Sequence, residues 1–231
     1  EIVSQKPYKE WVDTHTLPLS EVPYTNNTCP IEATKYDTRL RVFGYTLEDI
    51  STVINPMATQ SKEALGSMGI DTPLAVLSDK PQLLYNYFKQ LFAQVTNPPL
   101  DGIREEIITD ISLAIGGDRN IFDVIPEQAK KLRIQNPVIS NDDLDKLKNL
   151  KHPDFKSVVI PILYPISKGV NGLEKALDDI LVACEMAIFE GANIIILSDR
   201  GVDEDNAPIP ALMACSYVNH SLNKKQKRSK F

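Results

Sequence analysis

Residues 199–206 carry the side chains of this sequence that are best suited to bind or polarise a ligand. They follow the apolar run 193–197, which predicts a buried strand. Because α/β proteins bind ligands at the carboxyl ends of parallel strands, this acidic loop is a candidate binding site. Its charged members are Asp199, Arg200, Asp203, Glu204 and Asp205.

A metal ion, a flavin phosphate and a partner domain are the ligands that the acidic loop suggests. Carboxylates suit Mg²⁺, but no second cluster of ligands is recognisable, and acidic residues are common in solvated loops and at helix starts. A phosphate site needs backbone N–H groups, glycine and positive charge, whereas this loop is dominated by Asp and Glu. The sequence therefore favours a structural or interdomain role for the loop.

A second charged group, Arg104-Glu105-Glu106, follows the rigid Pro98-Pro99 break. Arg104 suits a bidentate contact with a carboxylate of another domain, and the alternative is an ordinary charge pattern at a helix start. The proline break favours a structural ion pair. Arg104 and Glu105 remain candidate interdomain contacts beside the acidic loop.

The cysteines and histidines of this sequence, which often act in catalysis or bind metals, belong to no recognisable motif. Cys29, Cys184 and Cys215 are far apart and fit no metal-binding spacing. His152 and His220 lie near no nucleophile motif, and no phosphate-binding glycine motif is present. We therefore predict no catalytic, cofactor-binding or metal-binding residue in this chain.

The charge balance argues against a nucleic-acid surface, because Lys and Arg number 25 against 31 Asp and Glu, which gives a net charge of −6. No apolar run reaches the ~20 residues that span a bilayer, so no membrane partner is expected. The dispersed cysteines suit a reducing compartment, and no signal peptide is visible. The chain opens on Glu-Ile-Val without methionine, which suggests a piece of a longer protein.

A strand–helix–strand unit should position the acidic loop. Residues 157–163 are a β-branched run typical of a buried strand, and an apolar stripe predicts a helix from Asn171 to a terminal glycine at Gly191. With strand 193–197 they form a βαβ unit, whose two strands should be parallel. A further helix should start at Pro208 or Pro210, and its buried face would consist of Leu212, Cys215, Val218 and Leu222.

The remaining segments give weaker patterns. Residues 79–95 predict an amphipathic helix with a buried aromatic face, and residues 107–115 alternate like a half-buried strand, although a helix would also group their isoleucines. Before them we expect a short helix over 2–13, an extended connector over 16–36 and a strand over 39–43. A helix with a capping box of Thr46 and Asp49 should follow and end at Asn55-Pro56. After them, Asn141 should cap a helix to Leu147, and the basic residues 223–230 read as a solvated connector rather than an anion-binding tail.

Four segments of the sequence closely resemble the central domain of the glutamate synthase large subunit. They are NPMATQSKEALGSMG (55–69), TPLAVLS (72–78), YFKQLFAQVTNPPLDGIREE (87–106) and LSDRGVDEDNAPIPALMACSYVNHSL (197–222). The resemblance covers nearly the whole chain from residue 5 onward. It implies an α/β fold that is a rudimentary, incomplete (β/α) barrel with a parallel sheet and flanking helices, similar to an FMN barrel without its cofactor site.

The resemblance also implies a domain organisation and a function. We expect an extended N-terminal connector over 1–36, a central α/β domain over 37–222, and a basic C-terminal segment over 223–231 that is truncated relative to the family domain. Glutamate synthases make two glutamates from glutamine and 2-oxoglutarate with reducing electrons. An amidotransferase domain with an N-terminal cysteine nucleophile releases ammonia, and a domain that binds FMN and an iron–sulfur cluster uses it. Since this chain starts at Glu1 and lacks the cysteine cluster, no family catalytic residue is carried onto it.

The chain would therefore be a non-catalytic connecting domain, inactive alone, that supports ammonia transfer between its two partner domains in the cytoplasm or a plastid. Two other functions remain open at this point. One is an independent α/β enzyme or divalent-metal-binding protein that uses residues 199–205, and the other is a vestigial flavin-binding module. Fold by itself does not separate them.

Overall fold

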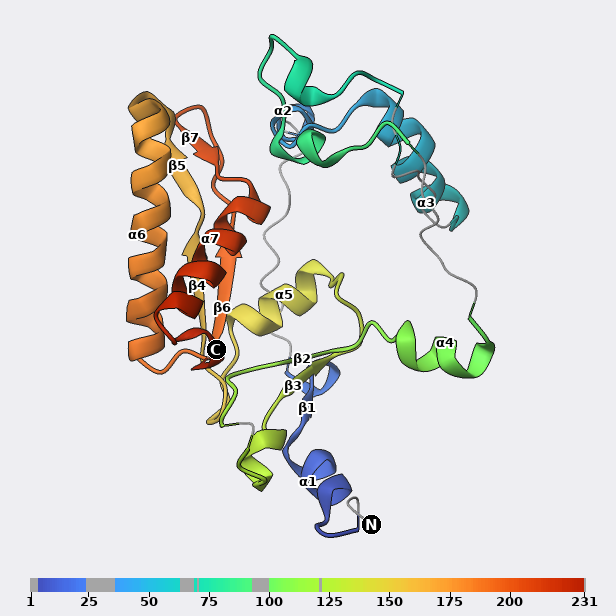
Figure 1. Ribbon diagram of the computed structural model, residues 1–231, viewed down its shortest axis with the longest axis vertical. Coiled ribbons are helices and arrows are strands. Elements are labelled where there is room, and N and C mark those ends of the chain that lie inside the picture. Colours follow the sequence, from blue (N-terminus) through green and yellow to red (C-terminus); the bar gives the residue numbers. More distant parts are fainter. Residues whose placement is uncertain are drawn as a thin grey trace. The chain divides into compact units, whose positions relative to one another are not determined.

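The computed structural model describes residues 4–23, 36–62, 69, 71–92, 100–120 and 122–230 (Figure 1). The chain divides into two compact units. We call Glu1–Thr28 with Thr109–Phe231 the main unit, and Cys29–Ile108 the inserted unit. Each unit is described by itself.

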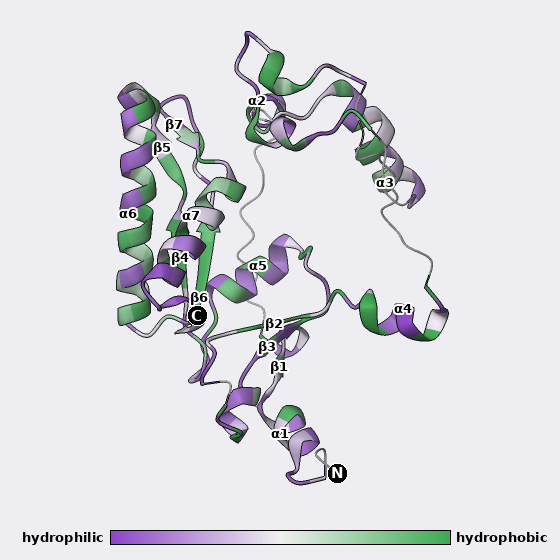
Figure 2. Cartoon of the chain, in the orientation of Figure 1, coloured by the Kyte–Doolittle hydropathy of each residue, from purple (hydrophilic) through white to green (hydrophobic). Residues whose placement is uncertain are grey.

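The predicted βαβ unit is present in the main unit. Strand β4 (Ser157–Pro161) pairs in parallel with β6 (Ile194–Ser198), and helix α6 (Gly169–Phe189) connects them. Both strands are rich in β-branched residues, which fit a pleated surface that is covered on its two faces. Figure 2 shows β6 as a hydrophobic strand, in agreement with this pattern.

The run 157–163 is not one strand, because its hydrogen-bond partner changes at Ile162. The Ile162 N–H donates to the Ser198 carbonyl (2.8 Å), and the Ile162 carbonyl accepts from the Ile209 N–H (2.8 Å). Beyond that residue, β5 (Leu163–Pro165) pairs antiparallel with β7 (Asn206–Pro208). The chain thus continues from β4 through Ile162 into β5, and it changes its pairing partner from β6 to β7.

Helix α6 ends at the predicted glycine. Gly191 has φ +87°, a left-handed conformation that glycine adopts at little cost. Its N–H donates to the Ile188 carbonyl, and the Ala192 N–H donates to the Ala187 carbonyl (2.9 Å). These two bonds form a Schellman motif, which satisfies carbonyls at the helix end. The start was predicted less well, because α6 begins at Gly169 and Asn171 is not its cap.

Helix α7 (Ala211–Lys224) begins after Pro210, as expected, but it buries a different face. Ala214, Val218 and Leu222 are buried at four-residue spacing. Leu212 is 45% exposed and Cys215 is also exposed, so the prediction was wrong for these two residues. The sequence pattern overlooked Ala214, a small residue that lets the helix approach its neighbours closely.

Two hydrophobic clusters cover the two faces of β4 and β6. Helices α6 and α7 contribute to the first, and helix α5 (Asn141–Lys148) to the second (Figure 1). The strand residues alternate between them, since Ile160 and Leu197 face the first cluster whereas Ile194 and Ile196 face the second. The buried members of the first are Ile160, Ile162, Ile180, Leu181, Cys184, Ile209, Ala214, Val218 and Leu222, and those of the second are Leu19, Val22, Leu132, Ile134, Leu147, Phe155 and Ile194.

A small sheet of three strands completes the main unit. Strand β3 (Leu132–Ile134) lies in the middle, with β1 (Leu17–Pro18) parallel on one side and β2 (Leu113–Ile115) antiparallel on the other. Helix α1 (Tyr8–His15) starts later than predicted and precedes β1. The 3-10 helices η1 (Leu19–Glu21) and η6 (Pro126–Ala129) lie near this sheet, whereas η7 (Ile166–Lys168) leads from β5 into α6 and η8 (Arg228–Lys230) follows α7.

The inserted unit contains helix α2 (Tyr36–Val42) where a strand over 39–43 was predicted, so that prediction was wrong. The capping box is confirmed. Asp49 Oδ2 accepts from the N–H (2.9 Å) and hydroxyl of Thr46, and the Asp49 N–H donates to Thr46 Oγ1 (3.1 Å). The backbone N–H of Thr46, followed by its hydroxyl, lowers the pKa of the Asp49 carboxyl.

The capped helix does not end at Asn55-Pro56. It passes through a π-helical segment, Asp49–Ile54, and continues as α3 (Asn55–Gln60). Pro56 has no N–H to donate, and the turn before it is wide, since the Asn55 N–H donates to the Ile50 carbonyl five residues earlier. The Thr52 hydroxyl also donates to the Glu48 carbonyl (2.7 Å).

Two further predictions for this region were wrong. Residues 79–92 form no long amphipathic helix; they contain only the 3-10 helix η5 (Leu84–Phe88), after η4 (Ala75–Leu77), and residues 93–95 lie outside the described residues. Residues 107–115 divide between α4 (Gly102–Ile108) and β2. A helix in a folded protein is stabilised mainly by the burial of its apolar face. Phe88, on the predicted apolar face, is 65% exposed.

The sheets in the described residues are small, with two, three and two strands, and none closes into a barrel. The architecture is mixed α/β with short parallel pairings and flanking helices. The βαβ unit is the most regular part, and it carries the acidic loop at the end of β6.

Candidate functional site

The acidic loop lies between β6 and β7, at the carboxyl end of β6, as the sequence predicted. Its position is not an open strand end of the kind that holds ligands in α/β barrels, because β5 and β7 continue beyond it. The Asp205 carbonyl also accepts from the Ile166 N–H (2.8 Å), which ties the end of the loop to the chain after β5.

Asp203 organises the loop through its own carboxylate. Oδ1 accepts from the backbone N–H groups of Asp205 (2.9 Å) and Asn206 (2.8 Å) and from Asn206 Nδ2 (2.9 Å). This is the local bonding by which Asp stabilises turns. Oδ1 of Asp203 is therefore occupied by hydrogen bonds within the loop itself.

Gly201 lets the loop pass close to β5. Its φ is +102°, and a Cβ at this position would lie 3.2 Å from Leu163 Cδ1. Both the backbone conformation and the close approach favour glycine. The path of residues 199–203 is thus fixed by sterics as well as by hydrogen bonds.

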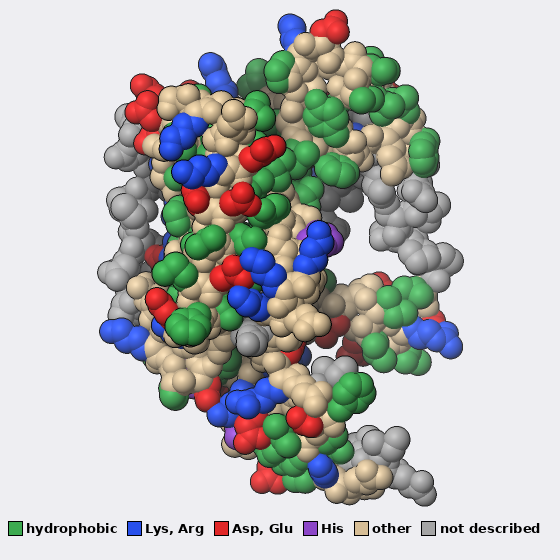
Figure 3. All heavy atoms as spheres, turned by 60° about the vertical axis from the view of Figure 1, so that its left-hand side comes forward, with side chains coloured by type: hydrophobic (Ala, Val, Ile, Leu, Met, Phe, Trp, Pro, Cys, Tyr) green, Lys and Arg blue, Asp and Glu red, His purple; other side chains and the backbone are tan. Residues whose placement is uncertain are grey.

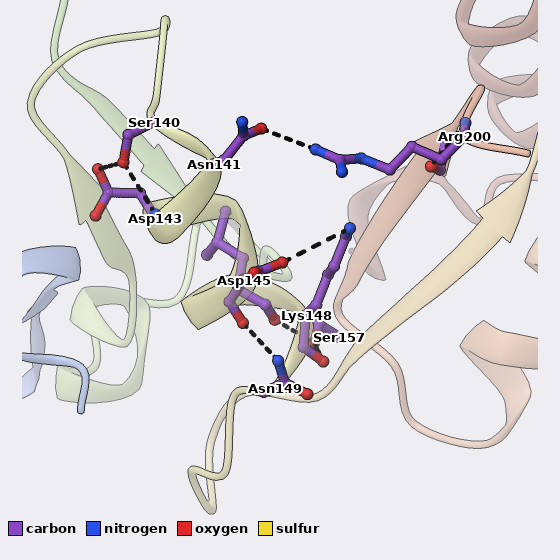
Figure 4. Close-up of polar contacts among 10 residues, drawn as sticks. Ser140, Asn141, Asp143, Asp145, Lys148, Asn149, Ser157 and Arg200 are labelled. Carbon is purple, nitrogen blue, oxygen red and sulfur yellow. Dashed lines mark hydrogen bonds and ion pairs between the residues drawn. The ribbon is translucent and has the colours of Figure 1, made fainter. Parts of the chain in front are cut away.

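Arg200 connects the loop to α5. Its Nη2 donates to Asn141 Oδ1 (2.8 Å), across 59 positions of sequence (Figure 4). Asn141 was predicted to cap α5, but the cap is Ser140, whose Oγ accepts from the Asp143 N–H (3.1 Å). The Asn141 side chain therefore does not cap the helix, and its Oδ1 accepts from the guanidinium of Arg200.

Helix α5 runs alongside the strands from the acidic loop to the start of β4. At its far end the Ser157 hydroxyl donates to the Leu147 carbonyl, and Asn149 Nδ2 donates to the Asp145 carbonyl (2.9 Å) (Figure 4). The Lys146 ammonium, with the Ser140 hydroxyl next, lowers the pKa of the Asp143 carboxyl near the helix start. The helix is therefore fixed at both ends.

Arg104 and Glu105 belong to the inserted unit and the five loop residues to the main unit. Arg104 pairs with Asp101 three residues earlier: its N–H donates to Asp101 Oδ1 (3.0 Å), and Nη1 contacts Oδ2. The Arg104 N–H, with the guanidinium adding to it, lowers the pKa of the Asp101 carboxyl. Arg104 thus forms an ion pair within its own segment, and its side chain remains 75% exposed.

Across the described residues, no three His, Cys, Asp or Glu side chains come together in a group able to hold a metal ion. The same part of the chain contains no helix with the length and apolar character needed to cross a bilayer.

The sequence pattern of the glutamate synthase central domain matches residues 38–231. This chain belongs to that family. It is 38% identical over 230 residues to the glutamate synthase [NADPH] large chain of Bacillus subtilis, covering all of this chain and 15% of that protein. It is 37% identical to the glutamate synthase [NADH] of Schizosaccharomyces pombe, covering 99% of this chain and 11% of that protein. It is 40% identical to the chloroplastic ferredoxin-dependent glutamate synthase of Spinacia oleracea, covering 96% of this chain and 14% of that protein.

Sequence reasoning missed the contacts that hold the C-terminal segment of this central domain. Lys225 and Lys227 both reach Glu185 on α6, at 2.9 and 2.8 Å. Lys227, followed by Lys225, lowers the pKa of the Glu185 carboxyl. Residues 223–229 are largely exposed, in agreement with a solvated segment, but these surface ion pairs were not predicted. No local signal in the sequence pairs residues 40 positions apart.

Replacing Asp203 with alanine should destabilise the main unit by roughly 1–2 kcal/mol, because three donors of the loop lose their acceptor. Urea unfolding followed by circular dichroism would measure the change. Asp205→Ala is the matched control, since Asp205 bonds to the loop through its backbone, and it should change the unfolding free energy by less than about 0.5 kcal/mol. Equal effects from both substitutions would contradict the assigned role of Asp203.

Proposed function

We propose that this chain is the non-catalytic connecting domain of a glutamate synthase, between an amidotransferase domain and an FMN-binding synthase domain. The carrying observation is that almost the whole chain matches the three relatives while spanning only 11–15% of their length. Such a segment has a place inside a longer polypeptide, and its neighbours there are other domains. We propose a location in the cytoplasm or a plastid, and the chloroplastic relative from spinach supports the second of these.

The acidic loop does not fit the phosphate of FMN. Four of its side chains are carboxylates, and the N–H groups of Asp205 and Asn206 already bond to Asp203. A phosphate there would meet negative charge and lack these donors. Cys184 does not fit an iron–sulfur cluster either, because its thiol is fully buried in the first cluster. FMN and the iron–sulfur cluster of the parent enzyme accordingly belong to another domain in this proposal.

The domain would fix the distance between the two active sites, and it would form part of the wall of the channel through which ammonia passes between them. Ammonia that escapes is lost to solvent, so the barrier must be continuous and rigid. The main unit suits a rigid spacer, since two clusters pack on opposite faces of β4 and β6 and the end of β6 is closed by β7. We further propose that its βαβ unit is the remnant of an incomplete barrel related to the FMN domain.

The candidate interdomain contacts are the exposed charges of the two units. Arg200 and Glu204 stand exposed on the acidic loop, and Arg104 stands exposed on α4. Charged groups at domain boundaries set orientation and register more than affinity. They are therefore suited to hold two active sites at a fixed separation.

The test is the coupling of the two half-reactions in the whole glutamate synthase large chain. With Asp199→Lys and Glu204→Lys together, we expect glutamine hydrolysis to exceed the reductive formation of glutamate from 2-oxoglutarate at least twofold, with the difference released as ammonia. Glu174→Lys with Asp179→Lys, both on the exposed side of α6, is the matched charge control and should leave the ratio unchanged. If the loop variant and an Arg104→Ala variant both keep the half-reactions coupled, these residues have no part in the transfer.

A further inference from the structure

Residues 4–23 are joined to the later part of the main unit by contacts between positions far apart in the sequence. The Leu17 N–H donates to the Lys131 carbonyl (2.9 Å). The Thr16 hydroxyl donates to the Ala129 carbonyl (3.2 Å), across 113 positions. Strand β1 also pairs with β3. Residues 4–23 are therefore attached to residues that follow the inserted unit in the sequence.

Apolar burial holds the same two parts of the main unit together. Leu19 and Val22 are each 6% exposed, and they pack in the second cluster with buried residues from 132 to 194. The first cluster consists of residues between 158 and 222. Every buried member of the two clusters lies in the main unit, which thus has a core built from its own residues.

The inserted unit has no comparable core in its described residues. Its hydrophobic side chains there are exposed or half-buried, and none of them is buried. Figure 3 shows many hydrophobic side chains at the surface of the protein. Because any neighbour can only add to burial, the described part of the inserted unit buries no more apolar surface by itself than this.

Short-range bonds stabilise the helices of the inserted unit. Thr46 and Asp49 form the capping box, and the Thr59 hydroxyl donates to the Asn55 carbonyl (2.7 Å). Bonds between residues three or four positions apart stabilise one helix and do not bring distant segments together. Since conformational entropy opposes the ordering of every residue, a unit without a core has little stability of its own.

We infer that the main unit folds without the inserted unit, and that the inserted unit unfolds separately while the main unit stays folded. Proteins open in cooperative units, and the buried contacts of each unit set its stability. The main unit holds the core and the long-range bonds, so it carries the higher stability. Residues 29–108 are then a module that reorganises while β4, β6 and the acidic loop keep their positions. This inference does not depend on the proposed function.

Deletion of the inserted unit tests the first part of the inference. Cys29–Ile108 is replaced by about ten Gly and Ser residues, which span roughly 17 Å on average. Strand β1 ends and β2 begins at the same end of the three-stranded sheet, so a short linker can join them. Trp11, the only tryptophan, lies on α1, and its fluorescence reports unfolding of the main unit. We expect one cooperative transition, with a urea midpoint within about 0.5 M of that of the full chain.

Leu132→Ala is the control for an intact core, because Leu132 is fully buried in the second cluster. It should lower the urea midpoint by about 1–2 M in the full chain and by the same amount in the deletion variant. A second deletion variant, with about twenty linker residues, shows whether the first linker is too short. A larger shift of the midpoint with both linkers, or loss of the cooperative transition with both, would overturn the inference.

Hydrogen exchange of the intact 231-residue chain tests the second part. In urea below the midpoint of the Trp11 transition, the amides of α3 should be protected at least tenfold less than those of residues 180–187 in α6. The exchange of α3 should also accelerate with urea, because unfolding of a whole unit exposes surface and fraying of a helix end does not. Equal protection of the two helices would show a single cooperative unit, and exchange of α3 that ignores urea would show fraying alone; either result would contradict separate unfolding.

Discussion

Replacing Leu222 with alanine should lower the free energy of unfolding by about 2–5 kcal/mol, among the largest effects of any single truncation in this chain. Leu222 is fully buried in the first cluster, near the end of α7. The lost methyl and methylene groups leave a cavity that α6 and α7 cannot close without moving. Urea unfolding of the 231-residue chain would measure the change.

Leu212→Ala is the control on the same helix. Leu212 is 45% exposed, so its truncation should cost less than about 1 kcal/mol, and the higher helix propensity of alanine offsets part of that. The pair tests which face of α7 is buried, since the sequence pattern placed both leucines inside. Similar losses at the two positions would mean that α7 packs in another orientation.

Cys184 should resist alkylation in the folded protein. Burial, with a smaller effect from the charge of Glu185, raises the pKa of the Cys184 thiol to about 11. At pH 8 such a thiol is ionised only to the order of 0.1%, against roughly a quarter for a free cysteine, and the thiolate is the reacting form. Cys215 is exposed on α7 and accessible to reagent.

The experiment uses variants in which Cys29, outside the described residues, is replaced by serine. With iodoacetamide at pH 8, Cys215 should be labelled on the order of 100-fold faster than Cys184, and mass spectrometry of peptides would give both rates. Raising the pH should speed the labelling of Cys184 until its pKa is passed, because its thiolate fraction keeps growing. Urea should remove the difference. Equal rates in the folded protein would place Cys184 at the surface.

The sequence predicted best where a signal is local. The apolar stripe of α6, its terminal glycine Gly191, and the capping box of Thr46 and Asp49 each depend on residues within a few positions of one another. The parallel pairing of β4 and β6 follows from the connection between them. These features need no knowledge of what else the chain contacts.

The failures have a common physical cause, which is that burial by distant segments decides structure where local signals are weak. Residues 84–92 carry a helical apolar pattern, but a pattern forms a helix only when something covers it. Arg200 contacts Asn141 within the main unit, but this partner lies 59 positions away and was predicted to cap a helix instead. The location of the acidic loop was therefore predictable, while its internal bonding through Asp203 was not.

The three-stranded sheet has a mechanical consequence for the inserted unit. Strand β1 is parallel to β3 and β2 is antiparallel to it, so the chain leaves β1 at Pro18 and enters β2 at Leu113 on the same end of the sheet. These points are two strand spacings apart, roughly 10 Å. The chain therefore leaves this sheet toward the inserted unit and returns from it at neighbouring points, and β3 bonds to both strands. Loss of β3 would thus release both connections at once, although Leu19 and Val22 would still hold the first of them in the second cluster.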